Sequence, residues 1–214
     1  MRSPLTIIGI CGWAIPSLWF QSQIKLAFPD SHVEAFYPQN PADENEAHSF
    51  INQNSAELWI GYSLGSLWLL KYAHLLKASK KTALLCPVLG FPNEMNLGGK
   101  ISVVQLNYIT RNLTRKPNDK SPVFDFLKLI GVNRNDKSFK LNIEPSTLLR
   151  GLEFLQNTSI DPENLPGNIA IMGDQDPLID YQSLRKLIPD LLVVPDAGHH
   201  PAPLLQSLAA SFQL

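Results

Sequence analysis

The 214-residue sequence has few cysteines, no long apolar segment and almost no net charge. Two cysteines, Cys11 and Cys86, are too few for a disulfide framework, and we expect both to be reduced core residues. No apolar stretch approaches the roughly 18 residues that a transmembrane helix needs. A net charge of −1 argues against a general nucleic-acid-binding protein. Since no cysteine and histidine cluster has metal-site spacing, we expect no metal and no other cofactor.

The first residues also lack the features of a secretory signal. Gly9, Gly12 and Pro16 interrupt the apolar run that follows Arg2, and no small-x-small cleavage site comes after it. We therefore expect a cytoplasmic protein that does not contact a membrane.

The composition, with 44% hydrophobic and 17% charged residues, is typical of one globular domain. Short β-rich apolar segments alternate with amphipathic segments along most of the chain. This order predicts an α/β fold, with a mainly parallel sheet of about six strands and helices on both faces. The segments expected to be strands are 5–10, 33–37, 58–60, 82–88, 168–172 and 191–194.

One region departs from this alternation. Residues 94–157 contain no convincing strand and three amphipathic segments, 101–113, 123–130 and 146–155, which we expect to be helices. The region carries ten Lys and Arg against six Asp and Glu, whereas the rest of the chain is acidic. We therefore expect a core formed by residues 1–93 and 158–214 and a basic helical insertion at 94–157.

The segment Gly61-Tyr62-Ser63-Leu64-Gly65 follows an apolar strand and precedes an apolar helical run. Gly-x-Ser-x-Gly between a strand and a helix is typical of a nucleophile elbow, a sharp turn that presents its serine at the end of a sheet. The helix after the serine points its N-terminal amides towards the place where negative charge develops in acyl transfer. The motif is short, so an ordinary turn is the competing interpretation.

Three more segments at predicted strand ends supply the other groups that acyl transfer needs. His199 would accept the proton of Ser63, and Asp176 would orient the imidazole ring. The backbone N–H groups of Trp13 and Leu64 would bind the oxyanion. A lone histidine or aspartate is usually a surface or turn residue. Here, however, four segments at four predicted strand ends supply the required groups, with serine, aspartate and histidine in that order along the chain. This agreement favours a catalytic site.

Two neighbours compete for the same roles. Asp174 precedes Asp176 in Gly173-Asp174-Gln175-Asp176, and His200 follows His199 before Pro201. We favour Asp176 because it lies further along the loop and nearer the expected cleft, and we interpret Asp174 as a turn residue.

These three motifs, Gly61–Gly65, Gly173-x-x-Asp176 and Gly198-His199-x-Pro201, resemble those of the α/β-hydrolase superfamily over essentially the whole chain. The resemblance implies a small member that lacks the first two superfamily strands and carries residues 94–157 as a helical cap.

Within that superfamily, the chain is most similar to the carboxylesterases of biotin synthesis that demethylate pimeloyl-acyl-carrier-protein methyl ester. The similarity rests on Gly12-Trp13, on the elbow and on the segment 147–155, which contains Gly151-Leu152-Glu153. It implies a serine carboxylesterase that forms an acyl-enzyme. The same groups would also serve a thioesterase or a small-ester hydrolase, and a non-catalytic binding protein of this fold is a third alternative.

The resemblance also implies a protein partner. Acyl carrier proteins are acidic, so a basic cap would attract one and orient it. Arg134, Lys137 and Lys140 are the candidate contacts, and we expect the enzyme itself to be a monomer.

Overall fold

The computed structural model describes residues 4–77, 80–133, 136, 138–165 and 169–212. Six parallel strands form one sheet in the order β2-β1-β3-β4-β7-β8. The strands are β1 (Thr6–Ile10), β2 (His32–Phe36), β3 (Leu58–Tyr62), β4 (Lys81–Leu85), β7 (Ile169–Gly173) and β8 (Leu192–Val194). The predicted α/β fold with about six strands is therefore confirmed.

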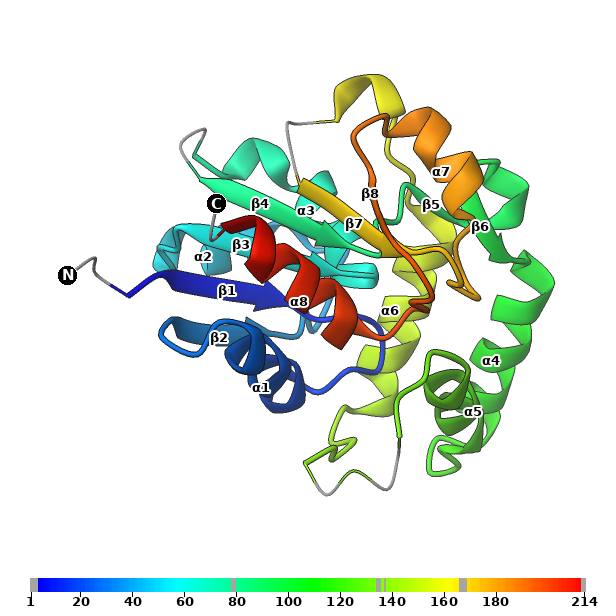
Figure 1. Ribbon diagram of the computed structural model, residues 1–214. Helices are drawn as coiled ribbons and strands as arrows, with labels where there is room; N and C mark the ends of the chain where they lie inside the picture. The colour runs from blue at the N-terminus through cyan, green and yellow to red at the C-terminus, as the bar shows by residue number, and fades with distance from the viewer. Residues whose placement is uncertain (1–3, 78–79, 134–135, 137, 166–168, 213–214) are drawn as a thin grey trace.

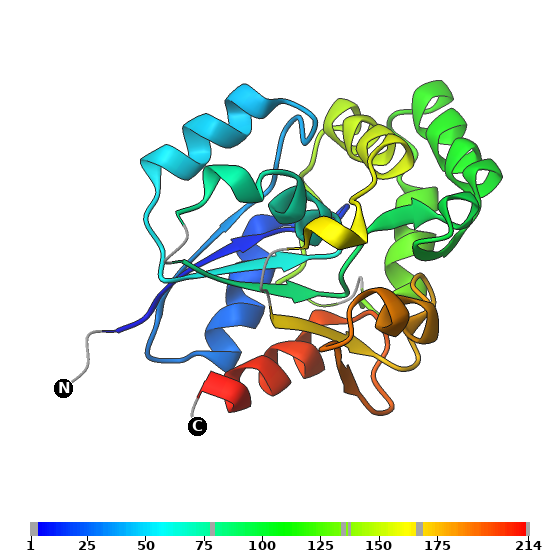
Figure 2. The ribbon, with the colours of Figure 1, turned by 90° about the horizontal axis from the view of Figure 1, so that it is seen from above.

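Helices cover both faces of this sheet (Figures 1 and 2). On one face lie α1 (Ser17–Ala27) and α8 (Pro201–Phe212), and on the other lie α2 (Glu44–Gln53) and α3 (Leu64–Lys71). The short helix α7 (Tyr181–Leu187) connects β7 to β8. Since the central strands have helices on both sides, both faces of a strand must be apolar. Every residue of β3 is accordingly buried.

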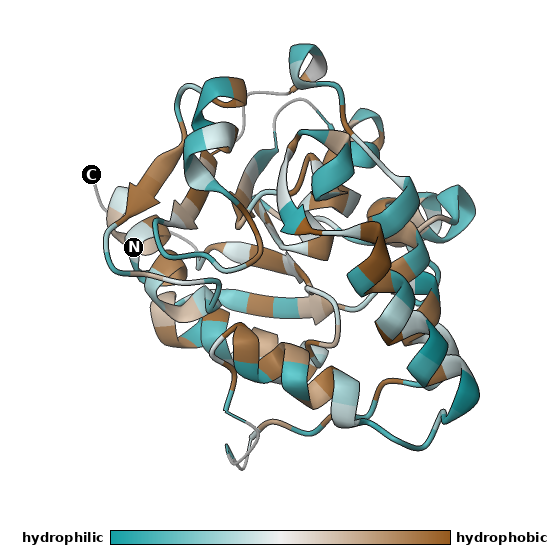
Figure 3. Ribbon diagram, turned by 90° about the vertical axis from the view of Figure 1, so that its right-hand side faces the viewer, coloured by the Kyte–Doolittle hydropathy of each residue, from teal (hydrophilic) through white to brown (hydrophobic). Residues whose placement is uncertain are grey.

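The hydropathy pattern follows these layers. The strands are mostly hydrophobic, whereas the outer helices mix hydrophobic and hydrophilic residues (Figure 3). Trp59, Trp68 and Tyr72 are among the large side chains that the core buries completely.

Cys11 and Cys86 are buried and unpaired, as predicted. Among the described residues, no helix combines the length and apolar character needed to cross a membrane.

Much of the described segment between β4 and β7 lies beyond the carboxyl ends of the strands (Figure 1). It contains β5 (Gly90–Pro92), β6 (Gly98–Ile101), α4 (Val103–Arg115), α5 (Ser121–Leu129) and α6 (Pro145–Asn157). The three helices expected from the sequence are present, with ends that differ by a few residues. The division of the chain into a core and a cap at residues 94 and 157 stays a prediction.

The expectation that residues 94–157 contain no strand is wrong. β6 pairs in parallel with β5 and forms a second, two-stranded sheet. Its sequence, Gly-Gly-Lys-Ile, has little of the β-branched and aromatic character that identifies strands. Gly98 has a φ of +91°, and a Cβ on Gly99 would collide with the backbone of Phe91. The strand therefore depends on close backbone approach, which a propensity pattern does not reveal.

Candidate active site

Ser63 occupies the turn between β3 and α3 with φ 53° and ψ −114°. This is a conformation that side-chain-bearing residues rarely adopt, and such strain is concentrated at functional sites. The flanking glycines have a steric reason. A Cβ on Gly61 would lie 2.6 Å from the carbonyl oxygen of Gly65, and a Cβ on Gly65 would collide with the backbone of Ile10. The turn is thus the sharp strand-to-helix elbow that the motif predicted.

The structure brings Ser63, His199 and Asp176 together. His199 Nε2 lies 3.0 Å from Ser63 Oγ, and His199 Nδ1 lies 2.7 Å from Asp176 Oδ2. All three residues are buried, with exposed fractions of 4% for Ser63, 1% for Asp176 and 1% for His199. Ser63 follows β3, Asp176 follows β7 and His199 follows β8, so the parallel sheet delivers all three to one edge.

Backbone groups hold the Asp176 carboxylate in place. Its Oδ1 accepts hydrogen bonds from the N–H groups of Leu178 and Ile179 at 2.8 and 3.0 Å, which leaves Oδ2 to face His199. Burial by itself would raise the pKa of Asp176. The charge interaction and hydrogen bond with His199, together with the two backbone donors, outweigh burial and hold this pKa below its ordinary value. The carboxylate is therefore ionised at neutral pH and can stabilise an imidazolium.

The loops after β7 and β8 are packed against each other. A Cβ on Gly173 would collide with the backbone of Ala197. The N–H of Gln175 donates to the carbonyl oxygen of Ala197 at 2.9 Å, and its side chain donates to Asp196 at 3.0 Å. This contact aligns the loop that carries the acid with the loop that carries the imidazole.

The two competing residues lie elsewhere. Asp174 donates its backbone N–H to the carbonyl oxygen of Val194, and its Oδ1 has no hydrogen-bond partner among the described residues. His200 packs edge-on against Trp19, and its Nδ1 accepts a hydrogen bond from the N–H of Ala202. Neither side chain takes part in the hydrogen bonds of Ser63.

The backbone donors expected for an oxyanion hole lie beside Ser63. Leu64 is the first residue of α3, where an N–H has no partner within the helix. No described residue accepts a hydrogen bond from the N–H of Trp13. A Cβ built on Gly12 would lie 3.3 Å from Ser63 Cβ, which places the Gly12-Trp13 turn against the elbow.

Gly151 of α6 packs against the residues of both expected donors. A Cβ at this position would lie 2.7 Å from Trp13 Cδ1 and 3.3 Å from Leu64 Cδ1. The Trp13 indole N–H also donates to the carbonyl oxygen of Leu148, one turn earlier on α6, at 2.9 Å. The segment 147–155 therefore packs directly on the residues that flank Ser63.

Three residues near the site carried no functional prediction. The hydroxyl of Tyr62 donates to the carbonyl oxygen of His199 at 2.9 Å, and the Cys86 thiol approaches the same oxygen at 3.5 Å. Lys100 donates from Nζ to the carbonyl oxygen of Asp176 at 2.7 Å. Since these contacts join residues 76 to 137 positions apart, no local pattern announces them.

Cys86, Asp176 and His199 place potential metal-ligand atoms within 4.8 Å of one another. Both ring nitrogens of His199 are already paired, with Ser63 and Asp176. Burial, together with the nearby Asp176 carboxylate, raises the pKa of Cys86 well above its ordinary value, so the thiol stays protonated. The group fits a hydrogen-bonded cluster and not a metal centre.

The candidate partner contacts are placed only in part. Lys140 is exposed on the segment between α5 and α6. Arg134 and Lys137 lie outside the described residues. Contact of this region with a carrier protein stays a prediction.

No protein-family model and no curated protein matches the sequence. Solved structures do match it over nearly its whole length. A thermophilic esterase from Thermogutta terrifontis is 11% identical with a TM-score of 0.64, and the match covers 99% of this chain and 89% of that one. A lipase-esterase related protein from Clostridium acetobutylicum is 14% identical with a TM-score of 0.67, covering 99% and 94%.

The bottromycin epimerase BotH is 12% identical with a TM-score of 0.64, covering 99% of this chain and 91% of that one. At these identities the similarity shows the fold alone. The chain has the α/β-hydrolase fold, as the motifs predicted. Since an epimerase also has such a structure, the reaction must be argued from the residues of the site.

Proposed function

We propose that the protein is a serine carboxylesterase. The observation that carries this proposal is the continuous chain of hydrogen bonds from Ser63 Oγ through the His199 ring to Asp176 Oδ2, with distances of 3.0 and 2.7 Å. A strained serine, a buried imidazole and an ionised carboxylate in this order form a nucleophile, a general base and an orienting acid.

In the proposed reaction, Ser63 Oγ attacks the ester carbonyl carbon while His199 Nε2 accepts the hydroxyl proton. The N–H groups of Trp13 and Leu64 stabilise the oxyanion, each contributing on the order of 3 kcal/mol to the lower barrier. His199 then protonates the departing alkoxide, which leaves as an alcohol, while the acyl group stays bonded to Ser63 as an acyl-enzyme. Water, deprotonated by His199, releases the carboxylic acid and regenerates Ser63.

For the substrate, we propose the methyl ester of pimeloyl-acyl carrier protein. The resemblance of segment 147–155 to the biotin-pathway esterases supports this choice, and Gly151 within that segment contacts Trp13 and Leu64, which flank Ser63. The insertion is also the basic part of the chain. A thioesterase or a small-ester hydrolase with the same groups is the alternative.

Two measurements test the reaction and the substrate separately. A fluorophosphonate probe should label the wild type and not Ser63→Ala, because labelling requires an activated serine. Ser63→Ala should also lose activity by roughly 10⁴-fold or more. Absence of labelling in the folded wild type would contradict the esterase proposal.

The substrate is tested by methanol release from pimeloyl-carrier-protein methyl ester at low and high salt. Rapid turnover that depends on Ser63 and slows in salt would support the proposed substrate. It would also support attraction of the acidic carrier protein by the basic residues of segment 94–157. No turnover of this ester, with active cleavage of short aryl esters, would keep the esterase proposal and overturn the substrate.

A further inference from the structure

The loop after β1 holds an alanine in a backbone conformation that alanine rarely adopts. Ala14 has a φ of 61°, in the left-handed region, and its side chain is completely buried. The N–H of Ile15 donates to the carbonyl oxygen of Gly12 at 3.2 Å, which closes a β-turn with Trp13 and Ala14 in its middle. A positive φ at the third position is typical of a type II turn, where glycine is the usual residue. Contacts outside the turn must therefore hold Ala14 in this conformation.

Tyr37, in the loop after β2, supplies such a contact. The N–H of Ala14 donates to the Tyr37 hydroxyl oxygen at 3.3 Å, and both residues are buried. Burial raises the pKa of Tyr37 above its ordinary value, so the hydroxyl stays neutral. Removing the hydroxyl would leave the N–H of Ala14 buried with no acceptor among the described residues, an arrangement that folded proteins avoid. The hydrogen bond thus favours the left-handed turn.

The position of β1 beside β2 brings the two loops together. The strands pair in parallel along their whole length, and the N–H of Cys11 donates to the carbonyl oxygen of Phe36 at 2.9 Å where they end. Ala14 and Tyr37 therefore meet at the same sheet edge that carries Ser63.

The turn also carries the proposed oxyanion donor. The N–H of the second residue takes no part in the hydrogen bond that closes a β-turn, and Trp13 is that residue. Gly12, the first residue of the turn, packs against Ser63. Because these residues share one hydrogen-bonded turn, a change in the backbone of Ala14 alters the direction of the Trp13 N–H.

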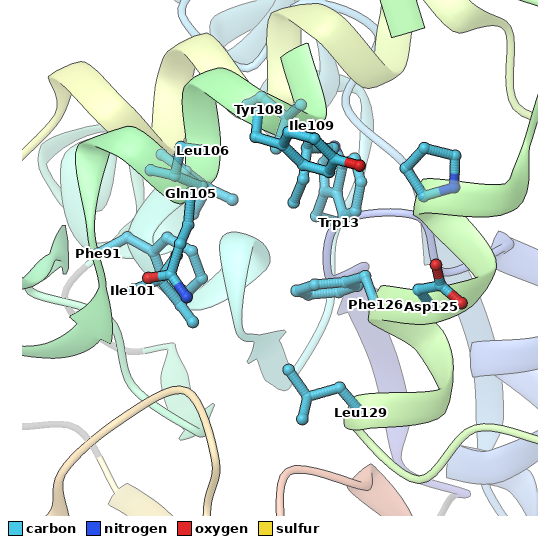
Figure 4. Close-up of a pocket in the computed structure, with 13 residues that line it drawn as sticks. Trp13, Phe91, Ile101, Gln105, Leu106, Tyr108, Ile109, Asp125, Phe126 and Leu129 are labelled. Atoms are coloured by element: carbon cyan, nitrogen blue, oxygen red, sulfur yellow. The ribbon is translucent and has the colours of Figure 1, made fainter. Parts of the chain in front are cut away.

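The side chain of Trp13 is held by other elements. Its indole N–H donates to the carbonyl oxygen of Leu148 at 2.9 Å, and the Phe126 ring lies edge-on to it with ring centres 4.8 Å apart (Figure 4). Trp13 and Phe126 both line a cavity of about 220 Å³ between α4 and α5. These contacts fix the indole, whereas the Tyr37 hydrogen bond acts on the backbone beside the Trp13 N–H.

We infer that Tyr37 is a positioning residue for the oxyanion hole, because its hydroxyl holds the turn that directs the Trp13 N–H towards the oxyanion formed at Ser63. The inference rests on the proposed esterase function and adds a residue to it. An oxyanion hole binds the transition state more strongly than the substrate, since negative charge develops on the oxygen only during the reaction. Loss of the Tyr37 hydroxyl should therefore lower kcat and leave KM nearly unchanged.

The first test measures kcat and KM of Tyr37→Phe with para-nitrophenyl butanoate. We expect kcat to fall about tenfold, less than after complete loss of an oxyanion donor, because the Trp13 N–H is displaced and not removed. Tyr72→Phe is the matched control, since it removes a buried hydroxyl that donates to the carbonyl oxygen of Pro41 at 3.2 Å, and should leave kcat unchanged. A wild-type kcat in Tyr37→Phe would overturn the inference.

The second test measures inhibition by trifluoromethyl hexyl ketone. Ser63 Oγ adds to the ketone carbonyl carbon, the hydroxyl proton passes to His199, and the ketone oxygen becomes an oxyanion that needs the same N–H groups. Tyr37→Phe should bind this ketone about tenfold more weakly, in proportion to the loss of kcat/KM. Wild-type inhibition together with a lower kcat would show that Tyr37 does not act through the oxyanion hole.

The third test adds Ala14→Gly to Tyr37→Phe. Glycine adopts a positive φ without steric cost, so the turn can keep its conformation when the hydrogen bond is absent. The double variant should recover most of the lost kcat and of the lost affinity for the ketone. A double variant as slow as Tyr37→Phe would contradict the role given to the turn.

Labelling by a fluorophosphonate separates this inference from the esterase proposal. The reaction builds negative charge on an oxygen at Ser63, so its rate should fall about tenfold in Tyr37→Phe whichever ester the enzyme prefers. Labelling of wild type and Tyr37→Phe at equal rates would overturn only the role of Tyr37. A folded wild type that is not labelled and does not bind the ketone would instead contradict the esterase proposal.

Discussion

Lys100 Nζ donates a hydrogen bond to the backbone carbonyl oxygen of Asp176 at 2.7 Å. The same strand adds two backbone contacts: Lys100 N–H donates to the carbonyl oxygen of Leu178 at 2.8 Å, and Asp180 N–H donates to that of Gly98 at 2.7 Å. β6 therefore holds the loop whose carboxylate faces His199. A short strand between β4 and β7 thus supports the loop of the proposed acid.

This contact predicts that Lys100→Met lowers kcat about fivefold and leaves KM nearly unchanged. The substitution keeps the length of the side chain and removes the donor, so the Asp176 loop loses one of its restraints. The loss is moderate because Lys100 is exposed and water replaces part of the hydrogen bond. Lys100→Arg should restore most of the kcat, and a wild-type kcat in Lys100→Met would contradict the argument.

Tyr62→Phe should reduce both stability and activity. The substitution removes only the hydroxyl that donates to the carbonyl oxygen of His199 at 2.9 Å. We expect a loss of about 1 kcal/mol in the free energy of unfolding and a roughly tenfold lower kcat, because the proposed base is less firmly positioned.

The chain offers a matched control for this substitution. Tyr72 is also buried, and its hydroxyl donates to the carbonyl oxygen of Pro41 at 3.2 Å, in a contact that involves no residue of the proposed triad. Tyr72→Phe should cost similar stability in urea unfolding and leave kcat unchanged. Equal kcat values for the two variants would show that the Tyr62 hydroxyl has only a structural role.

Gly151→Ala should inactivate the protein although the same change usually favours a helix by about 1 kcal/mol. The new methyl group would lie 2.7 Å from Trp13 Cδ1 and 3.3 Å from Leu64 Cδ1. Trp13 is buried and its indole is bonded to Leu148, so it has little room to move. We expect kcat to fall by more than tenfold, measured on any ester that the wild type cleaves. An active and more stable variant would show that α6 shifts without disturbing the elbow.

The lowered pKa of Asp176 predicts a pH-dependent contribution to stability. A carboxyl group whose pKa is lower in the folded than in the unfolded protein stabilises the fold fully above its unfolded pKa of about 3.9. This stabilisation disappears as the pH falls through the folded-state pKa. Asp176→Asn should therefore unfold more easily than wild type at pH 7, and the difference should shrink below about pH 4.

Urea unfolding of both proteins at several pH values measures this difference. Burial by itself would raise the pKa of Asp176. The interactions with His199 and with the N–H groups of Leu178 and Ile179 outweigh burial and lower this pKa. A stability difference that stays constant from pH 7 to pH 3 would contradict the lowered pKa.

Much of the candidate site could be predicted from the sequence because its motifs are local. The conformation of Ser63 follows from Gly61 and Gly65, two positions on either side, since both must tolerate close backbone contact. The alternation of apolar strands with helices implies a parallel sheet, and such a sheet gathers its carboxyl ends at one edge. Ser63, Asp176 and His199 could therefore be placed together without coordinates.

The sequence pattern separates adjacent candidates less clearly than it places the motifs. Asp174 and Asp176 are separated by a single residue, and only the hydrogen bonds of the folded loop show that Asp176 faces His199. The sequence pattern does not predict β6 for a related reason. Its glycines have low strand propensity, and pairing with β5 supplies the stabilisation that the local sequence lacks.

The sequence by itself thus determined the layered sheet, the sharp turn at Ser63 and the residue types that meet at the sheet edge, since each depends on periodicity or on neighbours within a few positions. Only the tertiary structure decided that Lys100 and Tyr62 restrain the loops of Asp176 and His199. These are contacts between distant segments, and their geometry depends on how helices and loops pack after the chain has folded.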